Sequence, residues 1–317
     1  MKVDDFAKQL FAQAKLQRAT DIYLLPSGKE YQLYFRCDNR RLPYQEMSKN
    51  DALSLIVHLK FLANMTVGEN RRIQLGALNY TLDHLTLRLR ISTVGDYRNQ
   101  ESMVIRLLHD FEVDRLCFLH PQQASQVAAL IRERGLYLFC GPVGSGKTTL
   151  MHYLAIQKFK GQQIVSIEDP VEIENTEMLQ LQLNEAIGLS YKELIKLSLR
   201  HRPDLLIVGE IRDKLTAKAV IQAALTGHTV FSTIHAKSPD SILARLLELG
   251  VSRVELENAL KGSIYQRLLE GRDEIGALLQ LNRTISVTNE DWNQSLEILA
   301  EQQLISKTVK AQELFDS

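Results

Sequence analysis

The segment that decides the fold of one part of this chain is Gly141-Pro142-Val143-Gly144-Ser145-Gly146-Lys147-Thr148-Thr149. It follows the apolar run 136–140 and precedes a helix-like stretch, so the order is strand, glycine-rich loop and helix. Glycines allow backbone N–H groups to turn toward phosphate oxygens. Lys147 brings a positive charge to the β- and γ-phosphates, and the Thr148 hydroxyl is a ligand for Mg²⁺. We therefore predict that residues 141–149 bind ATP together with Mg²⁺.

Composition limits the classes of protein to which the chain can belong. Its 317 residues, 45% of them hydrophobic, suffice for about two domains. The 38 basic and 38 acidic residues balance, so direct nucleic-acid binding is not expected. Three cysteines without a CxxC pair indicate reduced thiols and no structural zinc. Because we find neither a signal peptide nor an apolar stretch of about 20 residues, we expect a cytoplasmic protein without a transmembrane segment.

Residues 1–110 are expected to form a small α+β domain, and residues 111–120 a linker. Period-two alternation of apolar and polar residues predicts half-buried antiparallel strands. The elements predicted in this domain are a helix at 4–17, strands at 22–25 and 31–35, a helix at 49–63, and strands at 86–92 and 103–107.

Residues 121–285 are expected to form an α/β domain with a parallel sheet, because strand-like and helix-like segments alternate. Its active face should lie at the carboxyl ends of the strands. Residues 286–317 are expected to be a helical extension; the region 239–317 is predicted to be mainly helical, with one late strand at 277–281. The other predicted strands are 136–140, 164–168, 205–209 and 229–234, separated by helices at 147–158, 190–200 and 214–225.

Carboxylates follow two of these strands. Glu168, Asp169 and Glu172 lie within five residues, and such like charges repel unless a cation or a catalytic task offsets the repulsion. Glu210 follows the apolar run 205–208. We predict that Glu168 and Glu210 share water activation, with Glu210 also holding Mg²⁺, partly through water. The alternatives are an acidic solvated turn and an ordinary strand leaving the core.

Two histidines, His228 and His235, flank the strand predicted at 229–234. A lone histidine is more often a packing residue than a functional one. His235, however, stands at the end of the strand where the phosphates are expected. We predict that His235, with His228, senses the γ-phosphate as a hydrogen-bond donor.

Taken together, these segments resemble the secretion ATPases of the type II/type IV pilus superfamily over about residues 20–285. Near the amino terminus, Thr20-Asp21-Ile22-Tyr23 stands where that family has Ser-Asp-Ile-His. The four boxes that carry the resemblance are Walker A at Gly141 to Thr149, the acidic box from Ile167 to Glu172, Walker B from Arg200 to Asp213, and the His box from Ala223 to His235.

The resemblance implies a RecA-like ATPase domain in a hexamer, with a PAS-like amino-terminal domain that closes over the nucleotide. Arg90 and Arg106, followed by Arg36, are then candidates for arginine fingers; the alternative is that they lie on solvated strand faces. Arg200 and Arg212 are expected to pair with local carboxylates. The chain departs from the family where His201-Arg202 replace Gln-Asp, and where the segment 236–239 replaces Thr-Asn-Asp-Ala.

Features absent from the sequence point to one subclass. The chain lacks the four-cysteine zinc site of the large assembly ATPases and the Ala-Ile-Arg-Asn-Leu-Ile-Arg helix of retraction ATPases. It most resembles the competence-pilus assembly ATPases of Gram-positive bacteria, which power DNA uptake. This implies a motor that lies peripherally at the inner face of the membrane and acts on a polytopic platform protein. A retraction ATPase, a general type II secretion ATPase, a nucleic-acid translocase and a non-hydrolysing scaffold remain alternatives.

Overall fold

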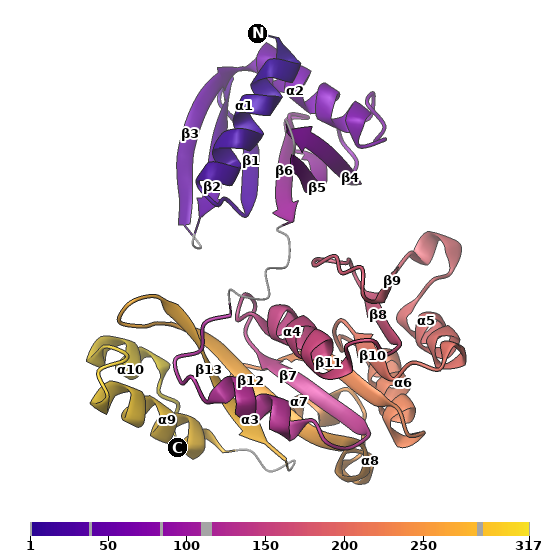
Figure 1. Cartoon of the computed structure of the whole chain (residues 1–317). Helices are drawn as coiled ribbons and strands as arrows, with labels where there is room; N and C mark the ends of the chain where they lie inside the picture. Colours follow the sequence, from indigo (N-terminus) through magenta and orange to yellow (C-terminus); the bar gives the residue numbers. More distant parts are fainter. Residues whose placement is uncertain (1, 38–39, 83–84, 109–115, 284–287, 317) are drawn as a thin grey trace. The chain divides into compact units, whose positions relative to one another are not determined.

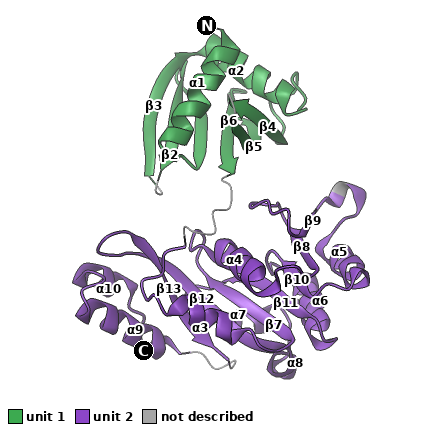
Figure 2. Ribbon diagram, in the orientation of Figure 1, with its two compact units in different colours: residues 1–110 green, residues 111–317 purple. Residues whose placement is uncertain are grey.

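The computed structural model describes residues 2–37, 40–82, 85–108, 116–283 and 288–316. The chain forms two compact units, Met1–Asp110 and Phe111–Ser317 (Figure 2). The predicted linker at 111–120 is only partly described. Its last residues belong to the second unit, because Leu119 N donates to Ala277 O and Cys117 O accepts from Ala277 N.

Unit 1 is a six-stranded antiparallel sheet with two helices on one face (Figure 1). The helices bury Leu10 and Leu55 against strand residues such as Ile22 and Leu89. The second helix begins after Ser48, whose side chain accepts from Asp51 N as an N-cap. Along the sheet the elements are β3 (Arg40–Ser48), β2 (Glu30–Cys37), β1 (Asp21–Ser27), β6 (Glu101–Leu108), β5 (Leu85–Gly95) and β4 (Gln74–Leu82), with α1 (Val3–Leu16) and α2 (Lys49–Leu62).

The sequence prediction missed both edge strands of this sheet, β3 and β4. β3 is mostly exposed and carries Pro43, and β4 contains Gly76. Proline and glycine are depleted in strands and lower the sequence signal for one. These strands form because a neighbouring strand pairs with them, which local sequence does not reveal.

Unit 2 is built on a seven-stranded sheet in which β13 alone is antiparallel to its neighbour. Across the sheet the strands are β13 (Ile275–Asn282), β12 (Leu260–Glu270), β7 (Gly135–Gly141), β11 (Thr229–His235), β10 (Leu205–Val208), β8 (Ile164–Glu168) and β9 (Leu179–Gln182). The helices are α3 (Gln123–Leu130), α4 (Lys147–Phe159), α5 (Tyr191–Ser198), α6 (Lys214–Leu225), α7 (Ser241–Glu248), α8 (Arg253–Ala259), α9 (Asn289–Glu301) and α10 (Lys307–Glu313).

Both faces of the central strand β7 are buried. Its residues alternate between two cores: Leu136 and Leu138 pack with α5, α6 and the carboxyl-terminal helices, whereas Tyr137 and Phe139 pack with α3 and α4. A strand covered on both faces is expected in a parallel sheet, and it explains the continuous apolar run that precedes the loop.

Residues 239–317 were expected to be mainly helical, and this expectation was wrong at residues 260–270, which form the long strand β12. β12 spans eleven residues and lies beside β7, where it separates β7 from the edge strand β13. The helices of the predicted extension 286–317 pack on their own unit: Trp292 is buried against Tyr265 of β12, with ring centroids 5.1 Å apart. No helix among the described residues is long and apolar enough to cross a membrane.

Candidate nucleotide site

The loop between β7 and α4 has the backbone that a phosphate cradle requires. Gly144 and Gly146 have positive φ angles of 78° and 82°, which glycine adopts without strain. A Cβ at Gly141 would lie 2.3 Å from Gln266 O, so only glycine fits there. Helix α4 starts directly after the loop, and its free N–H groups and dipole favour an anion at this end.

Lys147, in the first turn of α4, is buried, and its Nζ donates to Pro142 O at 2.7 Å and to Gly141 O at 3.1 Å. Burial lowers the pKa of Lys147. The charges of Glu210 and Glu172 oppose that shift in the pKa of Lys147. The side chain therefore stays within the loop, where its charge faces acidic groups.

A cavity of about 680 Å³ opens above the loop, at the carboxyl edge of the sheet. Its size is within the range of small-molecule sites. It is lined by Val143, Gly144, Gly146, Lys147, Thr148 and Thr149 of the loop and α4, by Glu168 at the end of β8 and Asp169, Pro170 and Glu172 after it, by Tyr191, by Gly209, Glu210 and Arg212 after β10, by Thr233 and His235 of β11, and by Leu268.

Glu210 stands at the rim of this cavity within a small ionic network. Its carboxylate pairs with Arg212, whose NH1 also donates to Asp169 Oδ2 at 3.0 Å. His235 Nε2 lies 3.5 Å from Glu210 Oε2. Burial and the positive charge of Lys147 lower the pKa of His235, so the imidazole is neutral at pH 7. Arg212 thus pairs with local carboxylates, as the sequence predicted.

Glu168 lies beneath the rim in a different environment. The residue is only 3% exposed. Its Oε1 accepts from Ser166 Oγ at 2.7 Å and from Gln180 Nε2 at 3.1 Å, and its Oε2 lies 3.7 Å from His152 Nε2. Burial alone would raise the pKa of Glu168, but His152 and the two hydrogen bonds outweigh burial and hold it below its ordinary value. Glu168 Oε1 is therefore engaged within the protein. Glu168 lines the cavity as a buried residue, and Glu172 lines it as an exposed one.

The structure does not bring His228 to this site. β11 runs parallel to β7, with Thr229 opposite Gly135 and His235 opposite Gly141. His228, which precedes β11, therefore lies at the amino ends of the strands, whereas the loop lies at their carboxyl ends. Its Nδ1 is 3.3 Å from Ala223 O at the end of α6. Proximity in sequence misled the prediction, because an extended strand of seven residues separates its two ends by roughly 20 Å.

The candidate arginines of unit 1 share one register row across its sheet. Arg36 pairs with Asp21, Asp21 with Arg106, and Arg106 with Arg90. Arg106 Nε donates to Asp21 Oδ1 at 3.0 Å, and Arg36 NH1 donates to Tyr23 OH at 3.1 Å. Directly paired residues of adjacent strands point to the same face. The three guanidinium groups therefore share the sheet face opposite α1 and α2, since Ile22 and Ile105 fill the helix-covered core.

Comparison with known proteins identifies the family. The model of the type II/IV secretion system proteins matches residues 2–294. This chain belongs to that family. It is 55% identical to the competence protein ComGA of Streptococcus pneumoniae over 269 residues, 85% of each chain. It is 36% identical to ComGA of Bacillus subtilis over 273 residues, 84% of this chain and 76% of the relative.

Solved structures agree on the fold. The pilus retraction motor PilT with bound ADP superposes with a TM-score of 0.74 at 23% identity, covering 98% of this chain and 97% of that one. The ATPase DotB of Legionella pneumophila gives the same TM-score at 18% identity, over 97% and 94% of the chains. The predicted fold class, an α/β ATPase domain with a smaller α+β amino-terminal domain, is confirmed, and so is the family resemblance.

The sequence analysis missed the residues that support the site in this family member. His152 lies inside α4, Gln180 in β9 and Gln266 in β12, and none of them belongs to a box. Tyr191 lines the cavity, where burial raises the pKa of its hydroxyl. His152 is a polar residue in the otherwise apolar stretch 150–154, which was the available signal, whereas the two glutamines have polar neighbours in sequence and gave none. The residues that these side chains contact could be identified only once the order of the strands in the sheet was known.

Proposed function

We propose that this chain is an ATP-hydrolysing motor that drives assembly of a competence pilus for DNA uptake. The observation that carries the proposal is one cavity that collects the phosphate loop, the carboxylates Glu172 and Glu210, and His235 at a single sheet edge. The pilus assignment is supported by 55% identity with a competence protein across 85% of both chains.

Binding of ATP rests on residues 141–149. The loop N–H groups and the amino end of α4 face the phosphates, and Lys147 supplies the compensating charge. Thr148 and Glu210 are the residues that would hold Mg²⁺, which neutralises charge on the phosphate oxygens. The described residues contain no group of three or more His, Cys, Asp or Glu that could hold a metal. Mg²⁺ keeps several waters and takes phosphate oxygens as ligands, so two protein ligands such as Thr148 and Glu210 fit it.

Hydrolysis requires a carboxylate that orients water and a donor at the terminal phosphate. Glu210 and Glu172 line the cavity and take the first role, with Arg212 holding Glu210 in place. His235 as a neutral imidazole takes the second. We assign Glu168 a supporting role in place of direct water activation, because Ser166, Gln180 and His152 surround its carboxylate.

We extend the proposal to a hexameric ring. The arginine row of unit 1, Arg90 and Arg106 with Arg36, supplies positive charge to the transferring phosphoryl group when the two domains close. Because nucleotide favours the closed arrangement, ATP turnover drives rotation between the domains. The ring acts at the inner face of the membrane on a polytopic platform protein, which adds pilin subunits.

Deletion of the gene in its own host, scored for surface pili and DNA uptake, tests this function. We expect loss of both, no rescue by a Lys147→Ala allele, and full rescue by the matched control Lys158→Ala on the exposed end of the same helix. Excess surface pili in the deletion strain would identify a retraction motor instead. Normal pili and normal uptake would contradict the proposal.

A further inference from the structure

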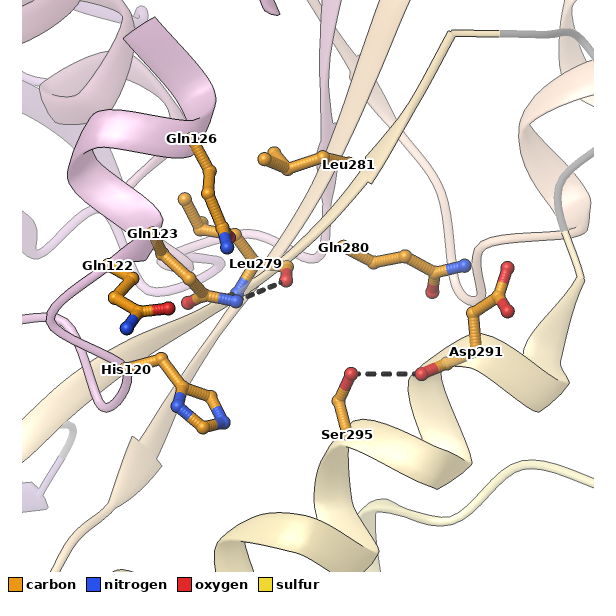
Figure 3. Close-up of a pocket in the computed structure, with 9 residues that line it drawn as sticks. All are labelled: His120, Gln122, Gln123, Gln126, Leu279, Gln280, Leu281, Asp291 and Ser295. Carbon is orange, nitrogen blue, oxygen red and sulfur yellow. Dashed lines mark hydrogen bonds between the residues drawn. The ribbon is translucent and has the colours of Figure 1, made fainter. Parts of the chain in front are cut away.

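A second cavity lies at the free edge of the sheet in unit 2, beside β13 (Figure 3). It has a volume of about 360 Å³, and it shares no residue with the nucleotide cavity. Residues from the α3 region, β13 and α9 line it: His120, Gln122, Gln123, Gln126, Leu279, Gln280, Leu281, Asp291 and Ser295. None of these nine residues is lysine or arginine.

Gln123 closes the sheet edge at one side of the cavity. Its Nε2 donates to Leu279 O at 2.6 Å, and its Oε1 accepts from Leu279 N at 3.1 Å. The buried amide therefore replaces a neighbouring strand, as the dashed contact in Figure 3 illustrates. Because the β13 main chain holds both polar atoms of Gln123, this residue shapes the wall of the cavity.

Gln280 presents a buried acceptor that has no donor. Its Nε2 donates to Thr288 O at 3.0 Å, which fixes the orientation of the amide. Its Oε1 has no hydrogen-bond partner among the described residues, although the residue is only 5% exposed. A buried carbonyl oxygen without a donor is unfavourable and is uncommon in folded proteins. This oxygen therefore lacks a donor on a residue that lines the cavity.

Asp291 adds a full negative charge to the lining of the same cavity, which Figure 3 shows together with Gln280. The side chain is exposed, in the first turn of α9, and pairs with no cation among the described residues. Ser295 Oγ donates to the main-chain oxygen of Asp291, so this hydrogen bond does not involve the Asp291 carboxylate. The cavity therefore combines a carboxylate and an amide oxygen, both acceptors, with no fixed positive charge.

We propose that this cavity binds a guanidinium or primary ammonium group, held by the Asp291 carboxylate and the Gln280 amide oxygen. Such a group supplies both the positive charge and the several N–H donors that these oxygens lack. It belongs either to a small organic cation or to a basic side chain of a polypeptide. The site is separate from ATP hydrolysis, so its occupation is a second binding activity of unit 2.

The chain contains its own reporter for this site. Trp292 is the one tryptophan in the sequence, it follows Asp291 directly, and it is fully buried with its Nε1 donating to Glu313 O. The experiment titrates the full-length protein with agmatine, with a blocked Gly-Arg-Gly peptide, and with pentanamide as a neutral control, while tryptophan fluorescence is recorded. We expect a saturable change with a cation and none with pentanamide.

The matched variants separate this site from general charge effects. Asp291→Asn and Gln280→Met should each raise the dissociation constant of the cation about tenfold. This is the factor expected when one hydrogen bond to a charged group is lost. Glu290→Gln, one residue earlier on α9 and outside the cavity, should bind as the wild type does. ATP turnover of all three variants should be unchanged, which verifies that they fold.

The two probes separate the sources of the cation. Binding of agmatine that depends on Asp291 supports the proposal with a free small cation as ligand. Binding of the peptide alone, with the same dependence, supports it with a polypeptide as the source. If no probe gives a saturable change, or if Asp291→Asn binds every probe as tightly as the wild type, the proposal is wrong.

Discussion

Glu168 and Glu210 occupy comparable places in the chain and very different places in the site. Glu168 is the last residue of β8 and Glu210 comes shortly after β10, and these two strands are adjacent and parallel. Glu168 is buried and held by Ser166, Gln180 and His152, whereas Glu210 stands at the rim beside Arg212 and His235. The comparison teaches that a carboxylate at a strand end supports either structure or chemistry, depending on which neighbours occupy its lone pairs.

The largest effect that the comparison predicts, after loss of the phosphate-loop lysine, is at the rim. Glu210→Gln should lower kcat on the order of 10³-fold, because the amide no longer orients or deprotonates water. The stability of unit 2 should change little, since the side chain is at the surface of the cavity. Steady-state ATP hydrolysis and urea unfolding measure the two quantities. A stability loss without a loss of turnover would reverse the roles assigned to the two residues.

Glu172 is another carboxylate that lines the nucleotide cavity, together with Glu210. Glu172→Gln should lower kcat on the order of 10²-fold, since this exposed carboxylate lines the cavity that holds Lys147 and Glu210. The matched control is Glu174→Gln, two residues later, exposed and outside the cavity lining. Equal turnover of the wild type and Glu172→Gln would remove Glu172 from the chemistry.

Beneath the rim, Glu168→Gln should mainly reduce stability, by about 2 kcal/mol at pH 7. The folded protein holds the pKa of Glu168 below its ordinary value. Its contribution is therefore present at pH values above the ordinary carboxyl pKa and is lost as the pH falls below it. Urea unfolding followed by Trp292 fluorescence at pH 7 and at acid pH should show the gap between the wild type and Glu168→Gln closing at acid pH. A gap that widens there would contradict the assignment.

The smallest effect concerns unit 1. Arg106→Ala should lower kcat about tenfold while Arg90 remains beside it, because the arginine row supplies charge jointly. The side chain is 59% exposed, so loss of its pair with Asp21 should change stability by less than about 1 kcal/mol. The exposed Arg98→Ala, in the turn between β5 and β6 and therefore outside the row, is the control. An unchanged kcat in Arg106→Ala would return Arg106 to the alternative of a solvated strand face.

Much of this site could be predicted from sequence because parallel strands bring their carboxyl ends to one edge. That rule placed the loop, Glu210 and His235 together. It failed for His228, which precedes its strand, and it gave no means to distinguish Glu168 from Glu172, because the difference arises from His152 and Gln180 on other elements. β12 was missed because Gly262 and Lys261 interrupt its apolar pattern, and it became a strand through pairing with β7.

The most direct test of the account is ATP turnover by the purified full-length chain with Mg²⁺, compared with Lys147→Ala. The account predicts hydrolysis by the wild type that depends on Mg²⁺, and none above background by Lys147→Ala, because the phosphates lose their compensating charge. Brisk hydrolysis by Lys147→Ala would contradict the account. A wild-type protein that binds ATP but does not hydrolyse it would contradict the account as well.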